Sequence, residues 1–374
     1  MTRIDLSARP HILVITLRRL GDVLLTTSLA RCLRRRYPQA ILHMLVFRSS
    51  AGILEGNPDL DAVITVSERP AAGESLRLMR RLWRRYDLAV STQPGDRPTL
   101  YALVAGRRRA SFIPAEGETG AGWKRRAHHV ALPLAPNQHR VDQLMALGRA
   151  LGLNGTAEIV CPHRHGTPDF ALPRPYAVVH ANPFYQYKRW TKTGWRELAR
   201  GLNGRGLSVV ATEGPDPAER AYLDDVWGSV RPPVNRIRAD WPDLACLLKG
   251  AALYVGPDTS TTHLAAATGC STIALYGPTS PRLIGPWPIG GLTEDWDEAG
   301  SIQRRGNVWV VQNPLACLPC EKLGCEGHLE SYSRCMDELP ASRILAAVDE
   351  ALRYGAGSAG MKQNSAPNPP ALRT

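Results

Sequence analysis

The sequence predicts an α/β protein built from two doubly wound, Rossmann-like layers. Short apolar runs typical of buried parallel strands alternate with longer segments of helical periodicity. This alternation runs from residue 12 to about residue 110 and starts again near residue 176. The 374 residues of the chain are also enough for two domains of ordinary size.

The N-terminal half opens with an apolar strand at 12–16, a turn at 17–22 and a helix at 23–36 that ends before Pro38. The same rhythm then continues. The other predicted elements of this half are strands at 41–47, 62–66 and 87–91, helices at 76–86 and 141–151, a further element that ends over 100–109, and a mobile Gly-rich basic loop at 117–126.

The second half repeats the pattern, so a cleft between two sheets is the expected place for a ligand. Its predicted strands are 176–180, 207–212, 251–255, 272–276 and 308–311, and its predicted helices are 195–203, a segment from 217, 244–248, 263–267 and 341–354. We expect an N-terminal domain over 1–165, a C-terminal domain over 166–340, a last helix over 341–354 and a disordered tail over 355–374.

Positive charge is concentrated in the first half of the chain. The net charge is +12, and residues 1–170 alone hold 25 Lys and Arg against 14 Asp and Glu, a difference of +11. Such a half should attract a phosphorylated glycan, an acidic lipid surface or a nucleic acid. The alternative is an Arg-rich composition that only forms a solvated surface.

No apolar run approaches the roughly 18 residues that a membrane span needs. The first apolar run is short and is followed at once by Arg18 and Arg19, unlike a signal peptide. The sequence therefore predicts a soluble, cytoplasmic protein.

The stretch 254–281 combines a strand, a capped turn, a helix and a second strand. The first strand stops at Gly256-Pro257, and Asp258, Thr259 and Ser260 follow, all of them good helix N-cap types. A helix N-terminus with free backbone N–H groups is a ready site for a phosphate. Capped turns of this kind also occur in βαβ units that bind nothing, so the stretch alone leaves both interpretations open.

Three segments together resemble glycosyltransferase family 9, the ADP-heptose:lipopolysaccharide heptosyltransferases. The first is ILVITLRRLGDVLLTT at 12–27. The second, at 180–198, contains Lys188-Arg189-Trp190 and WREL. The third is 254–281, which is similar to the family pattern D-[ST]-G-x-x-H-x-A-A-A followed by A-L-[FY]-G-P-T. The resemblance covers roughly residues 10–350.

The resemblance implies a GT-B fold, in which two Rossmann-like domains face a central cleft, with the last helix crossing back onto the N-terminal domain. It also implies an inverting transfer of heptose or a similar sugar from an ADP-sugar, with no cofactor and no catalytic metal. The implied acceptor is the anionic inner core of a lipopolysaccharide or a related glycan. The protein would then be cytoplasmic with peripheral contact to the inner membrane, and no nucleic acid is expected.

Asp22 is the expected catalytic base, because inverting transfer needs a group that takes the proton of the attacking hydroxyl. It follows Gly21 at a strand-to-helix turn, where the family carries its base. The alternative is that Asp22 only caps the helix that starts at Val23. Gly21, Arg18 and Arg19 are the expected acceptor contacts.

Lys188 is expected to meet the negative charge that grows on the departing diphosphate. Arg189 is the weaker candidate for the same role. The alternative is that Lys188 is only a solvated surface lysine without a role in catalysis. Glu213 follows the strand 207–212 at a position suited to ribose hydroxyls.

Asp258, Thr259, Ser260 and His263 are the other expected donor contacts. Asp258 is itself an anion, so it suits capping, a sugar hydroxyl or fixing the loop rather than a phosphate. His263 is either a donor to the ligand or a packing histidine. Ser260 replaces the Gly of the family pattern, and because Gly allows unusual φ and close approach, this change bears on donor choice.

Four late cysteines, Cys317, Cys320, Cys325 and Cys335, follow a spacing that suits a tetrahedral zinc site. A cytoplasmic location argues against disulfides. We expect a structural role, as a metal site or as packed thiols, since sugar transfer needs no thiol.

The basic N-terminal half then has a candidate purpose, which is to hold the phosphates or carboxylates of the acceptor at the membrane surface. The residues concerned are Arg18, Arg19, Arg48, Arg107, Arg108, Arg109, Lys124, Arg125 and Arg126. A non-enzymatic binder of nucleic acid or acidic glycan is the alternative, but the chain is only 6% aromatic and carries no recognisable nucleic-acid motif. A NAD-type dehydrogenase is weaker still, because the first turn lacks G-x-G-x-x-G.

Overall fold

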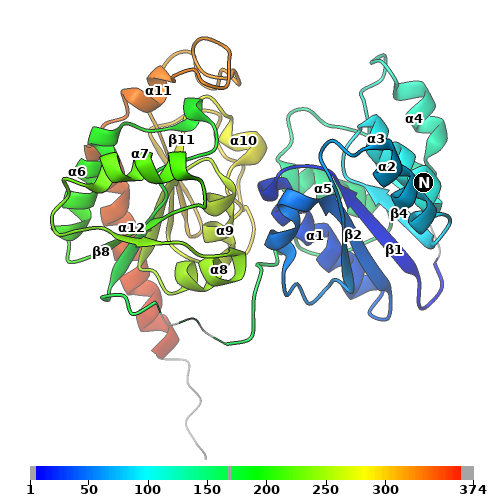
Figure 1. The fold of residues 1–374 in the computed structure, drawn as a ribbon, viewed down its shortest axis with the longest axis horizontal. Coiled ribbons are helices and arrows are strands. Elements are labelled where there is room, and N and C mark those ends of the chain that lie inside the picture. The colour runs from blue at the N-terminus through cyan, green and yellow to red at the C-terminus, as the bar shows by residue number, and fades with distance from the viewer. Residues whose placement is uncertain (1–5, 167, 169, 364–374) are drawn as a thin grey trace, which may run out of the picture.

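The computed structural model describes residues 6–363 except 167 and 169, and it forms two α/β domains side by side (Figure 1). The N-terminal domain holds a parallel sheet of six strands in the order β3-β2-β1-β4-β5-β6. Its strands are β1 His11–Thr16, β2 Ile41–Phe47, β3 Ala62–Val66, β4 Tyr86–Ser91, β5 Gly106–Ile113 and β6 Val130–Pro133.

Helices cover both faces of this sheet, as its apolar strands require. They are α1 Leu20–Arg36, η1 Arg48–Leu54, α2 Ala72–Leu82, α3 Asp96–Ala105, α4 Ala121–Ala127 and α5 Arg140–Ala150. Successive residues of β1 pack on opposite faces. Ile12 and Val14 join the apolar cluster under α1 and α5, whereas Leu13 and Ile15 join the cluster under α2 and α3.

The C-terminal domain holds a sheet of seven strands in the order β12-β13-β11-β10-β7-β8-β9, parallel except for β12. Its strands are β7 Tyr176–Val179, β8 Ser208–Thr212, β9 Asn235–Ile237, β10 Leu253–Pro257, β11 Thr272–Tyr276, β12 Ile302–Arg305 and β13 Val308–Gln312. Its helices are η2 Gln186–Lys188, α6 Lys192–Asn203, α7 Pro217–Trp227, α8 Trp241–Lys249, α9 Ser260–Thr268, α10 Pro281–Ile284, α11 Arg334–Asp337 and α12 Ala341–Gln363.

The last helix, α12, packs on the C-terminal domain. The resemblance had implied that it crosses back onto the N-terminal domain. It lies against α6 and the strands β10, β11 and β13. Ile344, Ala347, Val348 and Ala351 bury its apolar stripe in the core of that domain. The helix also extends to Gln363, past the predicted start of the tail, and 364–374 lie outside the described residues.

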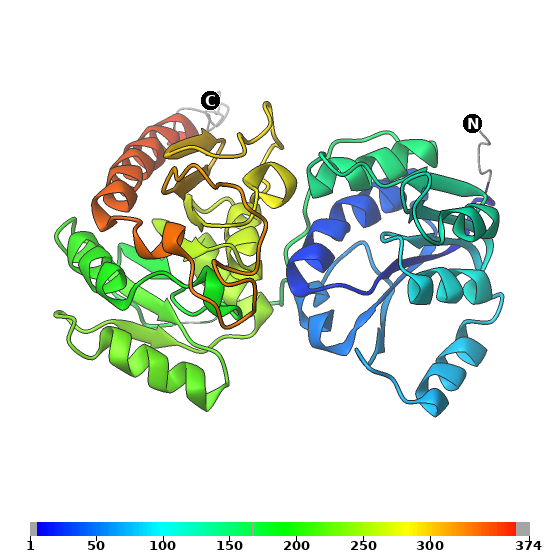
Figure 2. The same ribbon diagram turned by 90° about the horizontal axis from the view of Figure 1, so that it is seen from above.

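The two domains share apolar packing. In Figures 1 and 2, α1 and α5 lie on the side of the N-terminal sheet that faces the C-terminal domain. The largest apolar cluster contains residues of both domains, among them Leu29 and Leu144 on one side and Leu264 and Trp287 on the other. The predicted boundary at residue 165 falls in the connection 151–175 between α5 and β7.

The basic segment 117–126, predicted to be a mobile loop, forms α4 in part. Lys124, on the inner side of this short helix, is buried and lies 2.8 Å from Asp96 of α3. That ion pair explains why a Gly-rich, charged segment is held in place. Within the described part of the chain, no helix is both long and apolar enough to cross a membrane.

Candidate active site

Asp22 lies in the first turn of α1, at the carboxyl end of β1. The helix begins at Leu20, and Arg19 occupies the N-cap position without a side-chain cap. Asp22 therefore does not cap a helix beginning at Val23. Its Oδ1 lies 3.4 Å from Nη1 of Arg18 and 3.5 Å from Nε of Arg140. The carboxylate thus faces two guanidinium groups, and its side chain keeps an exposed fraction of 15%.

Arg140, the first residue of α5, belongs to this group although no sequence motif singles it out. Its side chain is buried, and Nη2 donates to the carbonyl of Thr92 at 2.7 Å. Burial lowers the pKa of Arg140 to about 10, with the negative charge of Asp22 acting in the opposite direction. The guanidinium is held in a fixed place and can orient the Asp22 carboxylate.

Across the cleft, Lys188 forms an ion pair with Asp258. Asp258 is buried at the end of β10, and its Oδ1 also accepts a hydrogen bond from the hydroxyl of Tyr276 at 3.3 Å. Burial favours the neutral acid, but Lys188 and His263 outweigh it and hold the pKa of Asp258 below its usual value. Of the three roles predicted for Asp258, which are capping, a sugar hydroxyl and fixing the loop, these contacts favour fixing the loop; they also place Lys188.

The N-terminus of α9 presents hydroxyl groups and no carboxylate in its first turn. The helix begins at Ser260, and the N-cap residue Thr259 makes no side-chain cap hydrogen bond. Ser260 has helical backbone and is absent from the described non-Gly residues with positive φ, so serine is not strained where the family pattern has Gly. The change therefore adds a hydroxyl rather than altering the backbone.

His263 is buried one turn into α9. Burial lowers its pKa, although Asp258 at 3.8 Å from Nε2 acts to raise it. Nδ1 is buried and has no hydrogen-bond partner among the described residues. The ring therefore holds an unused polar atom in the wall of the site.

The two helix N-termini meet at Gly21. A Cβ built on Gly21 would lie 3.3 Å from Cδ2 of His263 and 3.9 Å from Cα of Ser260. Both Asp22 and Lys188 contribute to the electrostatic environment of His263. The structure thus brings together Asp22, Gly21, Lys188, Asp258, Ser260 and His263, which lie far apart in the sequence.

Glu213 lies at the end of β8, as predicted, but its carboxylate is already engaged. Oε1 lies 3.1 Å from Arg220, and Oε2 accepts from Nε of Arg236 at 2.7 Å. Glu219 in α7, which the sequence did not single out, accepts hydrogen bonds from the backbone of Gly214 and from Asn182. Burial raises the pKa of Glu219. Glu219 is therefore a second candidate carboxylate at this strand end, besides the predicted Glu213.

The two arginines predicted to contact the acceptor point to different partners. Arg18 lies beside Asp22, whereas the guanidinium of Arg19 stacks over the ring of Tyr185 in the C-terminal domain, 4.3 Å from its centre. Arg19 thus contacts the C-terminal domain from the N-terminal domain.

Comparison with known proteins identifies the family. The model of glycosyltransferase family 9 (heptosyltransferase) matches residues 76–289, more than half of the chain. The chain belongs to glycosyltransferase family 9. The prediction of a glycosyltransferase is thereby confirmed, and with it the enzyme class.

Relatives in the family match most of the chain. Lipopolysaccharide heptosyltransferase 3 of Escherichia coli (strain K12) is 24% identical over 358 residues, which are 91% of this chain and 97% of that protein. Among solved structures, the family 9 glycosyltransferase of Veillonella parvula superposes with a TM-score of 0.75 at 17% identity, over 94% of this chain and 100% of that one. Heptosyltransferase WaaC of E. coli, solved with ADP, gives a TM-score of 0.68 at 19% identity, over 91% and 99%. These likenesses confirm the predicted GT-B fold with two Rossmann-like sheets.

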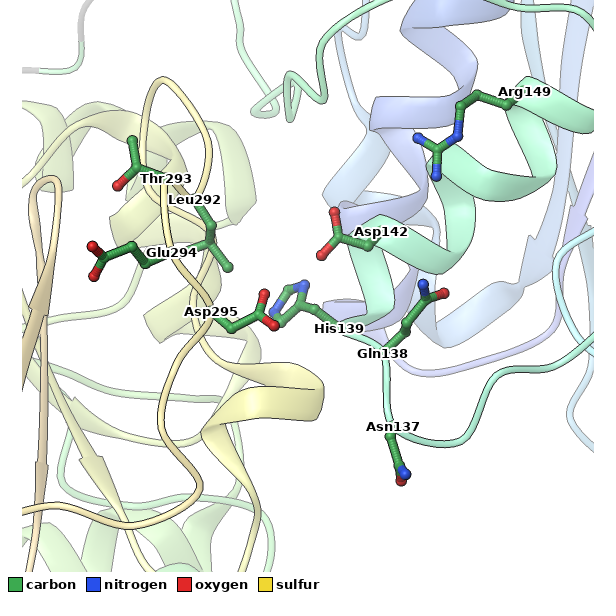
Figure 3. A pocket seen from close by; sticks show the side chains of 9 residues that line it. All are labelled: Asn137, Gln138, His139, Asp142, Arg149, Leu292, Thr293, Glu294 and Asp295. Atoms are coloured by element: carbon green, nitrogen blue, oxygen red, sulfur yellow. The ribbon is translucent and has the colours of Figure 1, made fainter.

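A cavity of about 380 Å³ lies between the domains, and none of the residues predicted for the glycosyltransferase site lines it (Figure 3). Figure 3 shows Asp142 and Arg149 on α5 across from the loop that carries Glu294 and Asp295. His139 is the N-cap of α5: Nδ1 accepts from the N–H of Val141 at 3.2 Å, so Nε2–H donates to the carbonyl of Gly285 at 2.9 Å. Burial lowers the pKa of His139 to about 4, which keeps this bridge between the domains neutral.

The four late cysteines are free thiols on the segment that leads into α11. Cys335 is buried, and burial raises its pKa to about 12, with the other three cysteines adding to the effect. Sγ of Cys325 accepts from the backbone N–H of Arg334 at 3.4 Å. Within the described residues, no group of three or more His, Cys, Asp or Glu is arranged to hold a metal ion, so the predicted zinc site has no support. Cys335, at least, is a packed thiol.

Proposed function

We propose that this enzyme transfers a heptose from ADP-heptose to the inner core of a lipopolysaccharide, with inversion at the anomeric carbon and without a metal. The observation that carries the proposal is the meeting of two helix N-termini, one bearing Asp22 and the other bearing Ser260 and His263, at Gly21. The names of relatives support the substrates: E. coli proteins similar to this chain are a lipopolysaccharide heptosyltransferase and a heptosyltransferase solved with ADP.

In this proposal Asp22 takes the proton of the acceptor hydroxyl as that oxygen attacks the anomeric carbon. Arg18 and Arg140 hold its carboxylate in place, and Arg18, with 44% of its side chain exposed, also faces an anionic acceptor. Inversion follows from a single displacement on the side opposite to the leaving diphosphate.

The diphosphate leaves toward the C-terminal domain. Lys188, placed by Asp258, supplies a cation, and the uncapped N-terminus of α9 supplies backbone N–H groups and hydroxyls. Nδ1 of His263 is a further hydrogen-bonding atom without a partner in the described structure. Glu219, Glu213 or both receive the ribose. The same proposal places the enzyme in the cytoplasm, in peripheral contact with the inner membrane that carries its acceptor.

The test is Asp22→Asn in the purified protein, assayed with ADP-heptose and a lipid A–core acceptor. We expect kcat to fall by about 10²–10⁴, the range typical of a lost general base, while donor affinity changes little. The matched control is Asp142→Asn, which removes a carboxylate from the neighbouring cavity and should keep near full activity. Unchanged turnover in Asp22→Asn would refute the base assignment, and turnover with UDP- or GDP-sugars alone would refute the donor.

A further inference from the structure

Three helices of the N-terminal domain, α2, α3 and α4, form a surface that we name the α2–α4 face. They lie together on the side of the N-terminal domain away from the C-terminal domain (Figures 1 and 2). The face carries five of the twelve large apolar side chains that the described structure exposes. These are Leu76, Trp83, Leu100, Leu103 and Trp123, with exposed fractions of 47%, 66%, 51%, 37% and 40%. Single exposed apolar residues are ordinary, but their grouping on adjacent helices marks an interaction surface.

The same face is strongly positive. Residues 72–126 contain twelve Lys and Arg and five Asp and Glu, so their net charge is +7. Four of the five acidic residues are already engaged: Glu74 with Arg48, Asp87 with Arg107, Asp96 with Lys124 and Glu116 with Arg125. Seven exposed arginines form no ion pair with any described carboxylate. They are Arg77, Arg80, Arg81, Arg84, Arg85, Arg108 and Arg126.

In the turn after α2, the adjacent side chains of Trp83 and Arg84 are both exposed. Arg84 has a left-handed φ of 46°, and its N–H donates to the carbonyl of Val104 at the end of α3 at 2.8 Å. This hydrogen bond ties the turn to α3, and Trp83, the residue before it, is the most exposed apolar side chain of the face. A tryptophan flanked by free arginines is the combination that favours the interface of an anionic membrane.

We propose that the α2–α4 face docks this protein on an anionic lipid bilayer. The arginines would be attracted to acidic headgroups, and Trp83 and the three leucines would enter the headgroup region. Charge of one sign interspersed with apolar side chains suits a lipid surface. A nucleic-acid surface would need the cations but would leave the apolar residues without a role.

The face adjoins the acceptor side of the candidate active site. The loop before α3 carries Gln93, whose Nε2 donates to the carbonyl of Leu17 at 3.2 Å, and Leu17 precedes Arg18. A docked protein therefore holds the loop that leads to Asp22 near the membrane. The docking proposal rests on the proposed function only for the claim that the acceptor is a lipid, because binding to lipid needs neither donor nor turnover.

The experiment is co-sedimentation of the full-length protein with vesicles of phosphatidylcholine alone or mixed with phosphatidylglycerol. We expect binding only to the mixed vesicles and weaker binding at high salt. Arg80→Glu with Arg81→Glu should weaken binding about 30-fold or more, since each cation near an anionic surface contributes about fivefold. Trp83→Ser with Leu100→Ser should weaken it about tenfold. The matched controls on the C-terminal domain, Arg200→Glu and Leu329→Ser, should change it less than about twofold.

Equal binding to uncharged vesicles, undiminished binding by both face variants, or equal losses in the controls would overturn the docking proposal. The proposal would also be overturned if random duplex DNA displaces the vesicles and its binding is weakened by the arginine variants but not by the Trp83 variant. If the charge-reversed variant fails to fold, Arg80→Gln with Arg81→Gln replaces it under the same criteria. Turnover of a delipidated core oligosaccharide should be unchanged in the face variants. Loss of that turnover in every protein, with face-dependent vesicle binding kept, would refute the proposed function and leave the docking surface standing.

Discussion

The N-termini of α1 and α9 have the same origin but different chemistry. Each follows the carboxyl end of a parallel strand, and neither has a side-chain cap on its N-cap residue, Arg19 or Thr259. In α1 the first turn contains the carboxylate of Asp22, which offsets the positive end of the helix dipole from within. In α9 the first turn contains no acid, so its positive end stays available for an anion from outside. Under the proposed function, one fold unit thus supplies the base on one side of the site and the diphosphate contacts on the other.

The two carboxylates of the site, Asp22 and Asp258, differ in their exposure and in how closely other groups engage them. Asp22 is partly exposed, and its arginine partners lie at 3.4 and 3.5 Å. Asp258 is buried and engaged by Lys188 and the Tyr276 hydroxyl. We infer that Asp22 is free to exchange a proton with substrate, while Asp258 keeps its charge and serves as a support.

Lys188→Met should lower both activity and stability. It removes the cation proposed to face the diphosphate, for which we expect kcat to fall by about 10²–10³. It also leaves Asp258 buried without its partner, which should cost about 3–5 kcal/mol of unfolding free energy. Urea unfolding and steady-state kinetics measure the two losses separately.

The double variant Lys188→Met with Asp258→Asn separates support from catalysis. Stability should return in large part because no buried charge remains unpaired, while activity should stay low. Lys192→Met, on the exposed surface of α6 beside Asp225, is the matched control and should alter neither. Recovery of activity in the double variant would contradict the role of Lys188 at the diphosphate.

Acid should destabilise both sides of the cleft through one buried histidine on each. His139 bridges α5 to Gly285, and His180 at the end of β7 bonds Thr212, and burial lowers the pKa of each to about 4. The unfolded chain titrates near 6.5, so it binds more protons than the folded state between pH 6.5 and pH 4. Stability should therefore be complete above pH 6.5 and fall as the pH is lowered, by about 2 kcal/mol per histidine at pH 5.

Urea unfolding at pH 7 and pH 5 measures this loss. His139→Gln should reduce the difference between the two pH values by about the share of one histidine, and His180→Gln by a similar amount. The exposed His328→Gln is the control and should leave it unchanged. A wild-type protein equally stable at both pH values would contradict the burial of neutral histidines at these positions.

Ser260→Gly should have the smallest effect and tests the α9 side most finely. Because Ser260 already has helical backbone, glycine relieves no strain, and it should lower stability by about 0.5–1 kcal/mol. The loss of one hydroxyl should weaken ADP-heptose binding by no more than about fivefold. Calorimetric titration with ADP- and other nucleotide-sugars checks this, and a change of preferred nucleotide would show that Ser260 sets donor choice.

The sequence predicted best those elements whose own residues determine them. The strands β2, β3 and β11 begin and end where their apolar runs do. The strands β6 and β9 escaped notice because they are half-exposed edge strands of only four and three residues. The helix α4 was missed because Lys124 is held by Asp96 of another element, which no local pattern reveals.

The candidate site divides in the same way. Asp22, Lys188, Asp258 and His263 stand at strand ends or helix starts, and a resemblance in their motifs is enough to single them out. Arg140 takes part because α5 packs beside α1 within the N-terminal domain, and Tyr185 takes part because the two domains pack together. Neither contact follows from a local sequence pattern. Glu219 was missed because its burial under Gly214 depends on the conformation of the turn.

The apolar cluster that runs from α1 and α5 into α8 and α9 also determines how the protein unfolds. Pulling the domains apart would wet Leu264 and Trp287 together with their neighbours on the other side. Because the two domains share this apolar cluster, heating should unfold both of them in one cooperative transition. A substitution that weakens the packing of the C-terminal domain would then also destabilise the N-terminal domain, even if it changes no residue of the candidate site.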